Sequence, residues 1–95
     1  MSSETVDRSY GPYFYALSHP ERLAAIRFIE EMTHRYPEIG AEATAGPGNE
    51  ETVYIYAPLP VDDDAYIEFH QTMARVSVKV LLDTGVSMVL MHRLE

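Results

Sequence analysis

The chain has 95 residues, no cysteine, and a net charge of -8 from fifteen Asp and Glu against seven Lys and Arg. The length is that of one small domain, and the missing thiols exclude disulfides and thiolate metal sites. So acidic a surface repels phosphate backbones, which argues against nucleic acids and anionic membranes as partners. We expect a cytoplasmic protein, and the acidic excess is also compatible with a halophilic source.

One domain is expected over residues 11–93. Residues 1–10 are polar and are expected to be disordered, and Leu94-Glu95 resembles a vector scar. No apolar run approaches the roughly 18 residues of a membrane span. The N-terminus also lacks the basic start and apolar stretch of a secretory signal.

The N-terminal half predicts a strand followed by a helix. Tyr13–Leu17 reads YFYAL, which is β-prone. The next four residues, Ser18 to Glu21, fit a capping box, and Pro37 is expected to end the helix near Tyr36. The apolar face of this helix has residues at helical spacing: Ala25, Phe28, Ile29, Met32 and Tyr36.

The C-terminal half predicts two strands, a helix and a last strand. The strands are expected at Gly40–Ala45 and Thr52–Ala57, on either side of a Gly-Pro-Gly-Asn turn. The helix is expected to begin after Asp62 and to end at Gly85, before a strand at Val86–His92. Its predicted buried face comprises Tyr66, Phe69, Met73, Val76, Val80 and Leu81.

The resulting order, β-α-β-β-α-β, predicts an α+β fold of the ferredoxin-like split kind. This fold has a four-stranded antiparallel sheet with two helices on one face. If Tyr13–Leu17 does not form a strand, the alternative is a three-stranded α+β layer.

Two segments resemble parts of known families. LLDTGVSMVL resembles the signature of retroviral-type aspartic proteases, which implies Asp83 as a catalytic acid. The helical periodicity before it favours a helix end at Gly85 instead. ALSHPERLAAIRFI resembles the opening helix of arsenic-repressor-type winged-helix regulators, but the following Pro37 and Gly-rich turn depart from that family's DNA-binding elements.

The expected sheet places tyrosines on its face without helices. Tyr13 and Tyr15 lie on one central strand, and Tyr54 and Tyr56 on the other. This arrangement resembles the RNA-recognition motif, which stacks bases on aromatic rings of the same two strands. EETVYIY, however, has carboxylates where cations would help. The favoured interpretation is an aromatic surface that packs against another protein surface.

No metal and no cofactor is expected. Asp62-Asp63-Asp64 offers the oxygen ligands of Mg²⁺ or Ca²⁺, but three adjacent carboxylates cannot all face one ion, so a helix cap is favoured. His70 falls on the apolar face of the second helix. It is either a core residue hydrogen-bonded to backbone or a hydroxyl, or a general base or metal ligand.

The last strand is apolar on both sides, so one side is expected to extend the tyrosine surface. The predicted binding surface comprises Tyr13, Tyr15, Tyr54, Tyr56, Val89 and Met91. We expect a non-catalytic homodimer that buries these faces, as dimeric α/β-barrel proteins do, with a protein partner or a small apolar or aromatic ligand. The alternative is a small cofactor-free enzyme whose pocket is lined by His70 and the tyrosines.

Overall fold

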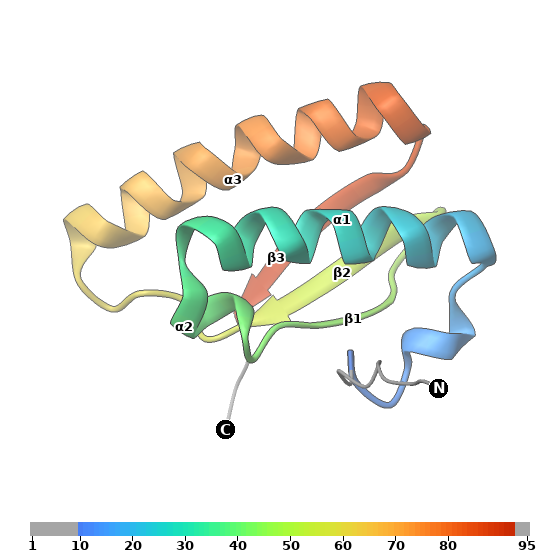
Figure 1. The fold of residues 1–95 in the computed structure, drawn as a ribbon, viewed down its shortest axis with the longest axis horizontal. Coiled ribbons are helices and arrows are strands. Elements are labelled where there is room, and N and C mark those ends of the chain that lie inside the picture. Colours follow the sequence, from blue (N-terminus) through green and yellow to red (C-terminus); the bar gives the residue numbers. More distant parts are fainter. Residues whose placement is uncertain (1–9, 93–95) are drawn as a thin grey trace.

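The computed structural model describes residues 10–92. The predicted disorder of residues 1–10, apart from Tyr10, and the vector scar at Leu94-Glu95 lie outside this part of the chain. In chain order the elements are η1 Phe14–Ala16, α1 His19–Arg35, α2 Pro37–Gly40, β1 Thr44–Pro47, β2 Thr52–Ala57, α3 Asp63–Thr84 and β3 Ser87–His92 (Figure 1).

The first element is a single 3-10 turn where the sequence predicts a strand. The amide of Leu17 donates to the carbonyl of Phe14 at 3.1 Å. This bond joins residues three apart, and both of these side chains are buried while Tyr13 and Tyr15 are exposed. The prediction of a strand at Tyr13–Leu17 is therefore wrong, because its buried positions repeat every three residues rather than every two.

The helix α1 begins as the sequence predicts. Ser18 Oγ accepts a hydrogen bond from the amide of Glu21 at 3.3 Å, and the Glu21 carboxylate accepts one from the amide of Ser18 at 2.9 Å. This capping box satisfies two amides that have no partner within the helix. The predicted end of the helix before Pro37 is also confirmed.

The sheet has three strands in the order β1-β2-β3. β2 lies in the middle and runs antiparallel to β1 and parallel to β3. The predicted four-stranded antiparallel ferredoxin-like sandwich is therefore wrong, although the α+β class is confirmed. β1 also begins at Thr44 rather than at Gly40, because α2 extends to Gly40.

The parallel pair follows from the strand that is missing at Tyr13–Leu17. In a split βαβ unit, another strand lies between the two parallel strands that a helix connects. Because η1 does not supply that strand, β3 pairs directly with β2. The connection between them is α3, and a helical crossover joins strands that run in the same direction.

Both ends of α3 match the predicted caps. Asp62 Oδ2 accepts a hydrogen bond from the amide of Ala65 at 3.0 Å. Gly85 has a φ of 78°, and its amide donates to the carbonyl of Leu81 at 2.7 Å. This left-handed cap favours glycine. The segment Asp83–Gly85 is therefore the end of a helix, and not the catalytic turn of an aspartic protease.

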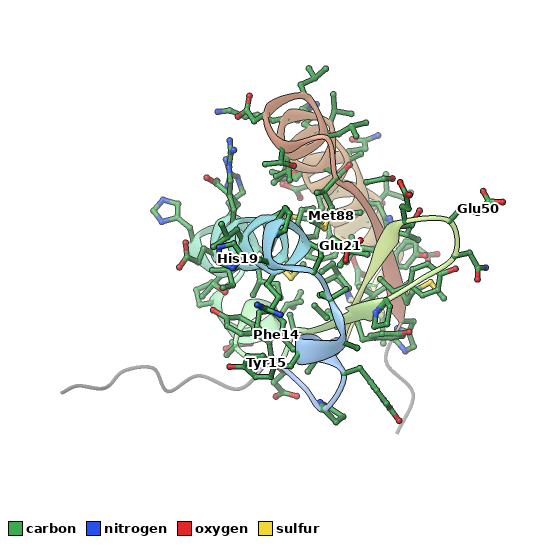
Figure 2. The ribbon with its side chains drawn as sticks, turned by 90° about the vertical axis from the view of Figure 1, so that its right-hand side faces the viewer. Phe14, Tyr15, His19, Glu21, Glu50 and Met88 are labelled. Atoms are coloured by element: carbon green, nitrogen blue, oxygen red, sulfur yellow. The ribbon has the colours of Figure 1, made fainter. Side chains whose placement is uncertain are left out.

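Both long helices cover the same face of the sheet (Figure 1). Met88 of β3 lies between the sheet and the helices (Figure 2). The largest fully buried side chains are Phe28, Phe69, Ile29, Met32, Ile55, Met73, Val53 and Val80. Within residues 10–92, no helix is long and apolar enough to cross a membrane.

Candidate interaction surface

The face of the sheet away from α1 and α3 is aromatic and apolar. Alternate residues of β2 point toward the helices and are fully buried: Val53, Ile55 and Ala57. Tyr54 and Tyr56 therefore point the other way. The parallel register places Tyr54 beside Val89 and Tyr56 beside Met91. We call the surface formed by these four side chains the open sheet face.

Tyr13 and Tyr15 lie on η1, outside the sheet. A Cβ added to Gly46 of β1 would lie 3.2 Å from Tyr13 Cβ and 3.9 Å from Tyr56 Cε2, so Tyr13 borders the open sheet face at this glycine. Tyr15 is 80% exposed, and the guanidinium of Arg22 lies 5.6 Å from the centre of its ring. Tyr15 therefore faces the start of α1 and does not join the other tyrosines.

The two edges of the sheet differ in their cover. The chain before η1 borders β1, since the amide of Ala45 donates to the carbonyl of Tyr10 at 2.9 Å. β3 has no neighbouring strand on its outer side among residues 10–92. Such an edge presents unpaired amides and carbonyls, and it readily accepts another strand. The predicted ferredoxin-like sheet also placed the last strand at an edge, because its two central strands were expected at Tyr13–Leu17 and Thr52–Ala57.

Next to its buried side, α3 carries a second side that has no charge. Its members recur at helical spacing, and we call them the α3 stripe: Tyr66, Ile67, His70, Ala74, Ser77, Val78 and Leu81. Tyr66 and Leu81 are 42% and 41% exposed, so their predicted burial in the core is wrong. Ile67 and Val78 are more exposed still. Clustered apolar exposure of this kind is typical of an interaction surface.

A groove of about 280 Å³ runs between the α3 stripe and β3. The residues that line it are Phe28, His70, Met73, Ala74, Ser77, Met88, Val89 and Leu90. The ring of His70 packs against that of Tyr66, with centroids 4.5 Å apart. Its Nε2 is buried and has no hydrogen-bond partner among residues 10–92. A buried polar atom without a partner is rare in native proteins, so this atom is the one polar feature of the groove that calls for an explanation.

His70 and the tyrosines do not form one pocket within a single chain. His70 lies on the side of the sheet that the helices cover, whereas Tyr54 and Tyr56 lie on the open sheet face. In the described part of the chain, no group of three or more His, Asp or Glu residues is placed to hold a metal. The arrangement therefore offers surfaces for binding, and within residues 10–92 nothing bonds to the Nε2 of His70.

Comparisons with known proteins add no functional assignment. No protein-family model, curated protein or solved structure matches the chain significantly. Function is therefore inferred from three adjoining features, which are the edge of β3, the α3 stripe and the open sheet face.

Proposed function

We propose that this chain is a non-catalytic dimerisation and protein-interaction domain, in which a second copy adds to β3. The observation that carries the proposal is the unpaired edge of β3 beside the groove and the α3 stripe. An added strand forms main-chain hydrogen bonds along such an edge. At the same time, the exposed apolar side chains of α3 are removed from water.

A second copy fits both features at once. Under two-fold symmetry, β3 of one copy pairs antiparallel with β3 of the other, and the two sheets become one. The two α3 stripes then face each other. Ala74 lies midway along the stripe, with Tyr66 and Ile67 on one side of it and Val78 and Leu81 on the other. If the two α3 helices run antiparallel and cross at Ala74, the Tyr66 end of one stripe faces the Leu81 end of the other.

The distribution of charge supports this surface over others. Each copy carries a net charge of -8, so two copies repel wherever their acidic surfaces meet. Between Tyr66 and Leu81, the charged residues of α3 lie off the stripe: Glu68, Arg75 and Lys79. The α3 stripe carries no charge, so two copies can approach each other closely there.

In this arrangement, the open sheet face remains available to a further partner. The joined sheet places two copies of it in one continuous surface, which suits a protein partner or a small apolar or aromatic ligand. The dimer expected from the sequence, with open sheet faces packed together, is the competing geometry. That geometry removes less additional apolar surface from water, because Tyr54 and Tyr56 are already partly buried in the single chain. The cytoplasm remains the proposed compartment, on the cysteine-free composition alone.

One observation favours a second function, a cofactor-free enzyme that uses the groove. The unpartnered Nε2 of His70 lies among apolar residues, which is an environment in which a histidine can act as a general base. The groove lacks both Tyr54 and Tyr56, so the substrate would itself have to supply the polar partner. For this reason we place the interaction function first.

Sedimentation equilibrium tests the dimer. The wild-type chain of 10.8 kDa is expected at twice that mass at high micromolar concentration. Val78→Glu places a carboxylate in each α3 stripe and is expected to raise the dissociation constant at least about tenfold. Val61→Glu is the matched control, because Val61 is 95% exposed and precedes α3. A monomeric wild type, or equal dimerisation of the two variants, would contradict the proposal.

A third variant separates the two dimer geometries. Tyr56→Glu changes the open sheet face on β2 and leaves both β3 and the α3 stripe intact. We expect this variant to dimerise like the wild type. If Tyr56→Glu dissociates the dimer and Val78→Glu does not, the copies associate through their open sheet faces instead.

A further inference from the structure

The basic side chains of this acidic protein gather in a hollow between α1 and α3. The whole chain has seven Lys and Arg residues. Four of these line the hollow: Arg27, Arg35, Arg75 and Lys79. One carboxylate, that of Glu31, lines it with them, and Val76 and Val80 add apolar surface. The hollow lies on a different side of α3 from the stripe, and the inference that follows does not depend on the proposed dimer.

Residues of α1 and α3 face each other in pairs across the hollow. We call each pair a rung, and successive rungs are one helical turn apart. Arg27 and Asp83 form the first rung, with Nη2 2.6 Å from Oδ2. One turn further along α1 and one turn back along α3, Glu31 comes opposite Lys79. The pKa of Glu31 is lowered by its hydrogen bond with Arg35 and, more weakly, by the charge of Lys79. These first two rungs pair opposite charges.

The third rung brings two cations together. One more turn along each helix places Arg35 opposite Arg75, and both line the hollow. Arg35 donates to Glu31 Oε1 at 2.5 Å. Arg75 has no ion pair or hydrogen bond of its side chain among residues 10–92, and Lys79 lies one turn away on the same helix. The carboxylate of Glu31 therefore offsets the charges of Arg35 and Lys79, and Arg75 adds a further cation to the hollow.

We propose that this hollow binds a small oxyanion, a phosphate group held between Arg35 and Arg75. Guanidinium groups donate parallel hydrogen bonds to phosphate oxygens, and a dianion offsets an excess of positive charge that one carboxylate does not. The hollow has a volume of about 130 Å³, whereas sites for larger ligands have roughly 300–1,000 Å³. It therefore accommodates inorganic phosphate, or the phosphoryl end of a small molecule against Val76 and Val80.

NMR titration with inorganic phosphate tests the site. Amide chemical shifts of the ¹⁵N-labelled protein are followed against chloride at matched ionic strength. We expect saturable changes that are concentrated at residues 31–35 and 75–79. Arg75→Gln is expected to weaken phosphate binding about tenfold, as the loss of a charge-assisted contact should. Because Arg75 is exposed and forms no ion pair in the described part of the chain, this variant should fold, and its amide spectrum shows directly whether it does.

Val61→Glu is the control for the effect of net charge on phosphate binding. Val61→Glu changes the net charge by the same amount as Arg75→Gln but lies before α3, and it should alter phosphate affinity by less than about twofold. Shifts that do not saturate, or that are the same in Arg75→Gln, overturn the proposal. Succinate that binds as tightly as phosphate at matched ionic strength overturns the assignment to a phosphate group.

Discussion

Arg27 and Asp83 form an ion pair with Nη2 and Oδ2 2.6 Å apart, which links the middle of α1 to the last turn of α3. The two residues are 56 positions apart in the sequence. Because the helices are antiparallel, this contact sets which residues face each other along the rest of their length. It therefore places the cationic hollow on one side of α3 and leaves the α3 stripe on the other.

The Arg27–Asp83 pair is expected to add little to stability despite its short distance. The side chains are 37% and 49% exposed, and exposed ion pairs contribute roughly 0.2–1 kcal/mol. Asp83→Asn should lower the free energy of unfolding within that range. Urea denaturation of Asp83→Asn, Arg27→Gln and the double variant measures the coupling between the two residues. A coupling well above about 1 kcal/mol would mean that the pair is less exposed to solvent than its surface suggests.

The capping box at Ser18 is expected to matter more than the ion pair. Ser18→Ala removes the acceptor for the Glu21 amide and should lower the free energy of unfolding by about 1 kcal/mol. Ser18→Asp keeps an acceptor in the same position, so its loss should be only a few tenths of a kcal/mol. Urea denaturation at neutral pH measures both variants. Equal losses from Ala and Asp would show that the hydroxyl does not act as the cap in solution.

Local signals predicted most of the elements correctly. Ser18, Asp62 and Gly85 are cap residues whose effect is confined to one turn, so the helix boundaries could be predicted from neighbouring residues alone. β2 shows the same, because its alternation of buried and partly buried residues follows directly from side-chain type.

The errors arose where a short apolar segment can bury its side chains in more than one secondary structure. Tyr13–Leu17 can bury alternate residues as a strand or every third residue as a 3-10 turn, and packing of Phe14 and Leu17 into the core decides between them. With that strand absent, the order of the sheet and the strand that β3 pairs with both changed. The hollow could not have been predicted either, because Arg35 and Arg75 come to line one hollow only through the register of two helices that are distant in sequence.

The ion pair between Arg35 and Glu31 predicts a dependence of stability on pH. The hydrogen bond with Arg35 lowers the pKa of Glu31 from its ordinary value of 4.5. The ionised carboxylate is therefore favoured in the folded state, and its contribution is present above the ordinary value and is lost as pH falls through the lowered pKa. Because the side chain is 43% exposed, this contribution should remain below about 1 kcal/mol.

Glu31→Gln measures this contribution. The free energy of unfolding of the wild type should exceed that of the variant at neutral pH, and the difference should vanish in acid. Glu30→Gln is the control on the same helix, because Glu30 forms no ion pair in the described part of the chain. Urea denaturation across the acid range gives the three curves. A difference between wild type and Glu31→Gln that persists at the lowest pH would show that the carboxylate acts through packing instead of charge.

Substitution of His70 tests whether the groove is a contact site. Its Nε2 is buried without a partner among residues 10–92, and removing an unsatisfied polar atom should raise the free energy of unfolding by about 1 kcal/mol. His70→Leu, which places an apolar side chain of similar size against Phe28 and Met73, should therefore be more stable than the wild type at low protein concentration. The control is His34→Leu on the exposed side of α1, which should change stability by less than about 0.5 kcal/mol. If His70→Leu is instead less stable, either the lost packing of the ring against Tyr66 dominates or a group from outside the single chain bonds to the Nε2 in solution. Repeating the measurement at concentrations below and above the dimer transition would then show whether that group belongs to a second copy.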